Sequence, residues 1–136
     1  MPAISLLSQS AHLLTFSKVF SAISIGFGIN AFVRPRHALT LFEFNPPAAA
    51  ADQQVVDGLI LVYGARNLFM GAALFAAAHF ENRETLGVLL VGTGLVAVVD
   101  GAVCKAKAGK GEWGHWIFTP VLVAVGCAVL GALDKF

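Results

Sequence analysis

Four long apolar runs constrain this chain more than any other feature of its sequence. Each run is close to the roughly 20 residues that a helix needs to cross the hydrocarbon core of a bilayer. Lipid offers an open backbone no hydrogen-bond partner, so we expect helices rather than strands. The pattern predicts an all-α, integral membrane four-helix bundle forming a single transmembrane domain over residues 1–136. The predicted helices cover about Leu13 to Phe32, Val55 to Ala78, Leu86 to Cys104 and Trp116 to Leu133.

Charged residues are scarce, at 12% of the chain, where a soluble domain has roughly 25%. The apolar runs also lack the polar outer faces that a soluble helical bundle presents to water. A net charge of +1 provides no basic surface for nucleic acid. We therefore expect the lipid bilayer, and no nucleic acid, among the partners of this protein. A homo-oligomer is compatible with these features.

Basic residues in the short loops predict how the bundle is oriented in the membrane. The first and third loops carry most of them, so we expect these two loops in the cytoplasm and both termini on the other side. The first and third loops hold Arg34, Arg36, Lys105, Lys107 and Lys110, and the opposite face holds Arg83 and Lys135.

The second run carries polar side chains that a plain membrane span does not need. Tyr63, Arg66 and Asn67 recur at offsets of three and four, so they share one helix face. An arginine at the centre of a membrane helix costs about 2.5–3.5 kcal/mol on insertion scales, so this face should point inward. Its counter-charge is either Asp100, near the end of the third run, or Asp57, in the first turn of the second.

The ion pair has two interpretations. In one, Arg66 and a carboxylate tie two helices together and do nothing else. In the other, they belong to a polar pocket, which the additional polar groups favour. Those groups gather toward the predicted cytoplasmic side: Asn30 ends the first helix, His115 and Trp116 open the fourth, and Glu43 lies in the first loop. Trp116 fits an interfacial aromatic belt as well as a ligand-binding wall.

Three blocks of the sequence resemble a known family. They are GINAFVRPRHALTLFEFNPP (28–47), YGARNLFMG (63–71) and the VAVVD that ends at Asp100, followed by His115. These blocks resemble a small family of four-helix integral membrane proteins of largely unassigned function, similar to the wider DoxX-like group. The sequence departs from the family at Glu43, near which a glycine is expected. Some fungal members belong to polyketide or terpenoid pathways, so the resemblance implies epoxide opening, by hydrolysis or cyclisation, and an endoplasmic reticulum location.

Carboxyl groups of unequal burial suit acid/base chemistry, because burial favours the protonated form and a nearby arginine favours the ionised form. The sequence therefore predicts an enzyme that acts on a lipophilic small molecule. Asp57 and Asp100 are the predicted acid/base pair, with Glu43 as a further catalytic candidate. The predicted substrate-binding or orienting residues are Tyr63, Arg66, Asn67, His115, Asn30 and Trp116.

Two other classes of function stay open. One is a non-catalytic membrane subunit or scaffold, in which the ion pair is purely structural. The other is a binding or transport protein for apolar molecules, although such proteins usually show inverted repeats or broken helices. We expect no cofactor and no metal, since the sequence has no paired cysteines, haem-ligand spacing or metal-type Cys and His spacing.

Overall fold

The computed structural model describes residues 6–134, and within this range it contains helices and no strand. A short 3-10 helix, Leu7–Gln9, precedes the first long helix. The α-helices are α1 (Ala11–Val33), α2 (Pro35–Thr40), α3 (Ala50–His79), α4 (Arg83–Ala108), α5 (Trp113–Trp116) and α6 (Phe118–Val129). Lys135, one of the basic residues used to predict orientation, lies outside the described residues.

The predicted all-α membrane bundle is confirmed, with corrections to the lengths of the spans. Three helices, α1, α3 and α4, are long and apolar enough to cross a membrane. The predicted second helix begins earlier, at Ala50, and the predicted third helix continues to Ala108.

The predicted fourth span is wrong as a single long helix. It is a shorter apolar segment, divided into α5 and α6 at Ile117. Pro120 explains the division, because proline has no N–H to donate to the carbonyl of Trp116, four residues earlier. Gly131 then ends α6 early, since its φ of 79° is the left-handed conformation typical of a helix C-terminus.

Residues at the helix ends explain where the long helices begin and stop. The Ser10 side chain accepts a hydrogen bond from the His12 N–H at the start of α1, and Asn82 does the same for Thr85 at the start of α4. Pro35 opens α2 at a position where its missing N–H costs nothing. Gly109, with a φ of 73°, terminates α4.

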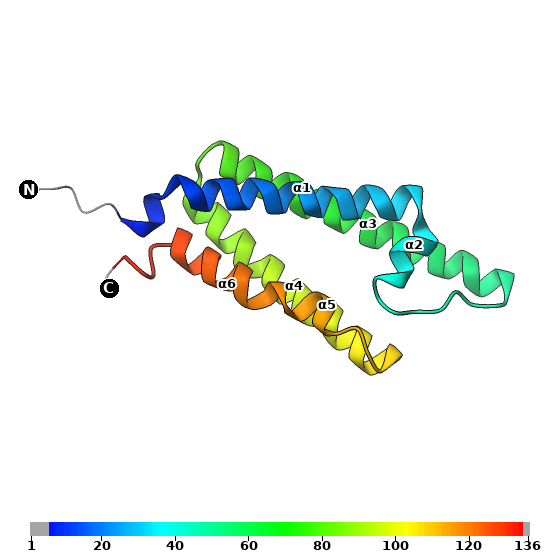
Figure 1. Ribbon diagram of the computed structural model, residues 1–136. Coiled ribbons are helices and arrows are strands. Elements are labelled where there is room, and N and C mark those ends of the chain that lie inside the picture. Colours follow the sequence, from blue (N-terminus) through cyan, green and yellow to red (C-terminus); the bar gives the residue numbers. More distant parts are fainter. Residues whose placement is uncertain (1–5, 135–136) are drawn as a thin grey trace, which may run out of the picture.

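The four main helices form two antiparallel pairs (Figure 1). Helices α1 and α3 pack along their lengths, and so do α4 and α6. Glycines set the closeness of both pairs: a Cβ atom on Gly71 of α3 would lie 2.9 Å from the Ser21 carbonyl oxygen of α1. A Cβ atom on Gly126 of α6 would lie 2.9 Å from the Gly87 carbonyl oxygen of α4. Such close approach of backbones is typical of helix packing in membranes.

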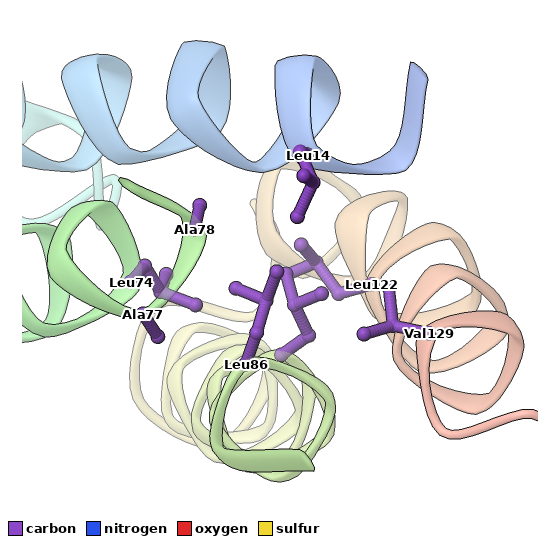
Figure 2. Packing of buried hydrophobic residues seen from close by; sticks show 8 residues of the cluster. Leu14, Leu74, Ala77, Ala78, Leu86, Leu122 and Val129 are labelled. Carbon is purple, nitrogen blue, oxygen red and sulfur yellow. The ribbon is translucent and has the colours of Figure 1, made fainter. Parts of the chain in front are cut away.

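An apolar cluster joins the two pairs at the end that holds the α3–α4 turn. Figure 2 shows Leu14, Leu74, Leu86, Leu122 and Val129 directed toward a common centre from α1, α3, α4 and α6. Leu74 and Leu86 are completely buried, and Leu122 is nearly so. The pairs diverge away from this cluster, toward the end where α2 and α5 lie (Figure 1).

Candidate functional site

A cavity of about 190 Å³ lies between the two helix pairs. Most of its wall is apolar, and the polar side chains come from four different elements. The apolar lining includes Phe20, Phe27, Leu41, Met70, Val96, Phe118 and Leu122. The polar lining consists of Ser24, Tyr63, Arg66, Asn67, Thr93, Asp100 and His115.

Arg66 of α3 and Asp100 of α4 form a two-pronged ion pair in the wall of this cavity. The Arg66 Nη1 atom donates to Asp100 Oδ1 at 3.1 Å, and Nη2 donates to Oδ2 at 2.7 Å. The Asp100 side chain is 15% exposed. A parallel pair of hydrogen bonds of this kind fixes the orientation of both planar groups. The structure thus pairs Arg66 with Asp100 rather than with Asp57.

Tyr63 lies one turn before Arg66 and contacts its guanidinium group. The Arg66 Cζ atom is 5.1 Å from the centroid of the Tyr63 ring, within the range of a cation–π interaction. The ring of Phe42, from the turn that follows α2, packs edge-on against Tyr63 at 5.0 Å. Tyr63 is therefore held from two sides while it lines the cavity.

His115 reaches the cavity from α5. Its ring stacks on Phe42 with 5.1 Å between the centroids, and its Nε2 atom lies 3.3 Å from the Leu41 carbonyl oxygen. A carbonyl oxygen only accepts hydrogen bonds, so Nε2 carries a hydrogen in this arrangement. Nδ1 is then the nitrogen left to exchange a proton.

Asn67 and Ser24 join α1 to α3 at the cavity wall. The Asn67 side chain donates from Nδ2 to the Tyr63 carbonyl oxygen at 3.0 Å. The Ser24 hydroxyl of α1 donates to the Asn67 carbonyl oxygen at 3.1 Å. Both residues are largely buried at the cavity wall, so these hydrogen bonds satisfy polar groups that have little contact with solvent.

The other two predicted carboxyl groups do not line the cavity. Asp57 is half-buried on α3, where its Oδ1 accepts a hydrogen bond of 2.6 Å from Gln53. Nine residues separate Asp57 from Arg66, which is two and a half turns at 3.6 residues per turn. The two side chains therefore lie on opposite faces of α3, a relation that the numbering alone could have indicated.

Glu43 lies at the surface and forms an ion pair of 3.0 Å with Lys110. Its φ of 59° places it in a tight turn after α2, beside Gly111. Glu43 thus connects the α2–α3 loop to the α4–α5 loop instead of lining the cavity. The predicted acid/base pair of Asp57 and Asp100 is not brought together.

Asn30 and Trp116 also lie outside the cavity lining. The Asn30 Oδ1 atom is 3.1 Å from His37 Nδ1. The Trp116 indole N–H donates to the Val98 carbonyl oxygen at 3.1 Å, and the indole ring packs over Gly101. Of the nine predicted site residues, the structure brings five to one cavity: Tyr63, Arg66, Asn67, Asp100 and His115.

Two hydroxyl residues of the cavity were missing from the sequence prediction, Ser24 and Thr93. A signal for Ser24 was present, because Ser17, Ser21 and Ser24 recur at offsets of four and three on α1 and so share one face. Thr93 has no comparable signal. Among residues 6–134, no three His, Cys, Asp or Glu side chains gather where they could hold a metal ion.

Comparison with known proteins gives one match. Searches of curated proteins and of solved structures each found no match to this chain. The model of a domain of unknown function, DUF4267, matches residues 21–129. The matched region contains every cavity-lining residue except Phe20. Because the match covers most of the chain, this protein belongs to the DUF4267 family.

Proposed function

We propose that the protein is a membrane-embedded enzyme that opens an epoxide ring on a lipophilic small molecule. One observation carries the proposal: an arginine-bound carboxylate, Asp100, lines a mostly apolar cavity together with His115 and Tyr63. The resemblance to DoxX-like proteins of fungal natural-product pathways supports the same substrate class. It also supports a location in the endoplasmic reticulum.

The size of the cavity limits what it accepts. Pockets for drug-sized ligands usually measure about 300–1,000 Å³, and this one measures about 190 Å³. The substrate is therefore a small molecule, or a longer one of which one end enters the cavity. Its lipophilic character follows from the phenylalanine, leucine and methionine side chains in the wall.

In the proposed reaction, the Asp100 carboxylate acts as general base. It accepts a proton from water, or from a hydroxyl of the substrate, as that oxygen attacks an epoxide carbon. The C–O bond of the ring breaks, and charged His115 donates a proton from Nδ1 to the leaving oxygen. Tyr63 and Asn67 orient the epoxide. Proton transfer from Asp100 to His115 through solvent restores both groups, so the net reaction is hydration or ring closure.

The test is turnover of styrene oxide and 1,2-epoxyoctane by microsomes that contain the full chain. We expect Asp100→Asn to lower kcat/KM about 100-fold, as loss of a general base does. Asp57→Asn is the matched variant, because it removes a carboxylate from the face of α3 that points away from Arg66 and the cavity. It should retain wild-type turnover. Immunoblotting of the membranes checks that each variant accumulates equally. Unchanged turnover by Asp100→Asn, or loss by Asp57→Asn instead, would overturn the assignment.

A second candidate function is a non-catalytic membrane component. It is favoured by the fact that Arg66 engages both oxygens of Asp100, as a tie between helix pairs would. This alternative predicts that the wild type shows no epoxide turnover and that Asp100→Asn lowers the amount of protein. It also predicts that the double variant Arg66→Met with Asp100→Leu restores the amount, because removal of both charges leaves none unpaired. If Asp100 is instead catalytic, the wild type turns over the epoxide and the double variant is abundant but inactive.

A further inference from the structure

The inner wall of the cavity carries two hydroxyl groups with the same hydrogen-bonding state. Ser24 of α1 donates its single hydroxyl hydrogen to the Asn67 carbonyl oxygen at 3.1 Å. Thr93 of α4 donates its single hydroxyl hydrogen to the Leu89 carbonyl oxygen at 2.8 Å. A hydroxyl has one hydrogen and two lone pairs, so each oxygen retains only the capacity to accept.

The two hydroxyl groups belong to one level of the cavity. Asn67, which binds Ser24, lies 13 residues before Phe80, and Thr93 lies 11 residues after Asn82. At 1.5 Å per residue, Asn67 and Thr93 lie at distances from the α3–α4 turn, measured along their helices, that differ by about 3 Å. Asp100 lies seven residues beyond Thr93 on α4, which is about 10 Å farther along the helix. The cavity thus has an acceptor end at Ser24 and Thr93, and the Asp100 carboxylate, which the Arg66 side chain reaches from α3, lies farther along α4.

The side chains of Phe20, Met70 and Leu122 near the acceptor end are apolar, and the Asn67 amide, which donates to the Tyr63 carbonyl oxygen, is the polar group beside the two hydroxyls. Both hydroxyls already donate to a backbone carbonyl oxygen, so a ligand that places an apolar group there leaves only their lone pairs without a donor, whereas a ligand O–H donates to one of them. A site built to bind a substrate hydroxyl discriminates strongly against analogues that lack it. A cationic ammonium group is disfavoured because the carboxylate of the cavity, Asp100, is already paired with Arg66, and a buried cation without a counter-charge costs more than a neutral hydroxyl.

We propose that the cavity selects lipophilic molecules that carry a neutral hydroxyl group, which donates to Ser24 or Thr93 at the end remote from Asp100. The inference deepens the proposed function and rests on it, because it takes the cavity as the site of a lipophilic substrate. It makes that substrate a hydroxylated one, with its reactive end toward Asp100 and its hydroxyl about one and a half to two helical turns away.

The experiment compares two probes that differ by one hydroxyl group, 1-naphthol and naphthalene. Binding to the full chain in nanodiscs is measured by equilibrium dialysis against empty nanodiscs, which corrects for partition into lipid. We expect the wild type to bind 1-naphthol more tightly than naphthalene. The Kd for 1-naphthol should rise about fivefold in the double variant Ser24→Ala with Thr93→Val. This is the size of effect typical of one lost hydrogen bond. The Kd for naphthalene should stay unchanged.

Matched controls separate recognition from folding. Ser21→Ala and Thr119→Val remove hydroxyl groups that donate to the Ser17 and Gly94 carbonyl oxygens outside the cavity lining, and they should leave both Kd values unchanged. Thr93→Ser retains the hydroxyl and should bind 1-naphthol with the Kd of the wild type. Ala97→Phe fills the cavity and should abolish binding of both probes.

Three results would overturn the inference: no saturable binding of 1-naphthol to the wild type, equal affinity for both probes, or equal losses for both probes in the double variant. The proposed function is decided separately by epoxide turnover, measured for this purpose with 7,8-epoxyoctan-1-ol beside 1,2-epoxyoctane, because only the former carries the hydroxyl that the inference requires. Turnover that depends on Asp100 while hydroxyl selectivity is absent removes the inference and leaves the function. Selective 1-naphthol binding without turnover removes the enzyme and leaves a binding site for hydroxylated lipophiles.

Discussion

At the scale of residues, two ion pairs hold charged side chains that lie close to the apolar interior. Arg66 and Asp100 neutralise each other within the cavity wall, and Lys105 and Glu112 form an ion pair of 2.8 Å at the end of α4. Glu112 is buried, whereas the Lys105 side chain is 57% exposed. Pairing offsets the cost of taking the Asp100 and Glu112 carboxylates partly out of water.

Glu112 makes stability depend on pH in a predictable direction. The hydrogen bond from Lys105, and next a bond from its own backbone, lower the pKa of Glu112 below its ordinary value of 4.5. A lowered pKa in the folded state means that the contribution is complete above about pH 4.5 and is lost as the pH falls through the folded value. The Tm of the purified protein should therefore exceed that of Glu112→Gln at pH 7, and the difference should vanish toward pH 3.

Lys105→Met provides the control for this titration. Without the ammonium group, the pKa of Glu112 loses its main cause of lowering, so the pH dependence of Tm attributable to this site should largely disappear. A wild type and a Glu112→Gln variant that lose Tm in parallel from pH 7 to pH 3 would contradict the prediction.

At the scale of helices, packing within each pair depends on glycines at points where two backbones meet. A Cβ atom on Gly71 would lie 2.9 Å from the Ser21 carbonyl oxygen and 3.0 Å from the Ile25 backbone nitrogen. Backbone atoms cannot rotate away as a flexible side chain can. Gly26 of α1 is different, because a Cβ atom there meets nothing within 4 Å.

Gly71→Ala should destabilise the protein by about 1–3 kcal/mol, the usual effect of overpacking a close contact. Gly26→Ala is the matched control, and it should be neutral or slightly stabilising, because alanine favours the helix over glycine. Equilibrium unfolding in mixed detergent–SDS micelles measures both variants under one condition. Equal losses of stability in the two variants would show that the α1–α3 contact does not depend on this glycine.

At the scale of the whole molecule, two helix pairs join at the apolar cluster of Leu14, Leu74, Leu86, Leu122 and Val129, and the site lies where they separate. One end of the molecule is closely packed, and the other holds the cavity. Contacts between the pairs at the cavity end are polar or aromatic: Arg66 with Asp100, and Phe42 with His115. The cavity is thus a consequence of how the pairs diverge.

The orientation in the membrane is a further prediction at this scale. The basic residues of the first and third loops predict that those loops face the cytoplasm. In a cysteine-free background, Asn45→Cys and Lys107→Cys should react with a membrane-impermeant maleimide from the cytoplasmic side. Glu84→Cys, at the exposed start of α4, should react from the opposite side. Labelling of all three positions from one side would contradict the predicted topology.

Much of the fold follows from local pattern. The length and hydropathy of the runs predict α1, α3 and α4, because a helix satisfies its own backbone hydrogen bonds without any partner. The fourth helix was predicted too long, although Pro120 and Gly131 were visible in the sequence, because apolar composition says nothing about a broken hydrogen-bond ladder. Tyr63, Arg66 and Asn67 were placed on one face correctly, since that relation depends only on helical periodicity.

The partners of that face depend on contacts between distant segments. The sequence alone determined that the chain forms apolar helices and that one of them carries an inward-facing arginine, because both follow from spacing within a single element. Tertiary structure decided that Arg66 binds Asp100 and not Asp57, that Glu43 binds Lys110 at the surface, and that Ser24 and Thr93 line the same cavity. Each of these joins residues on different elements or different helix faces, and their distances are set by how the helix pairs pack and diverge.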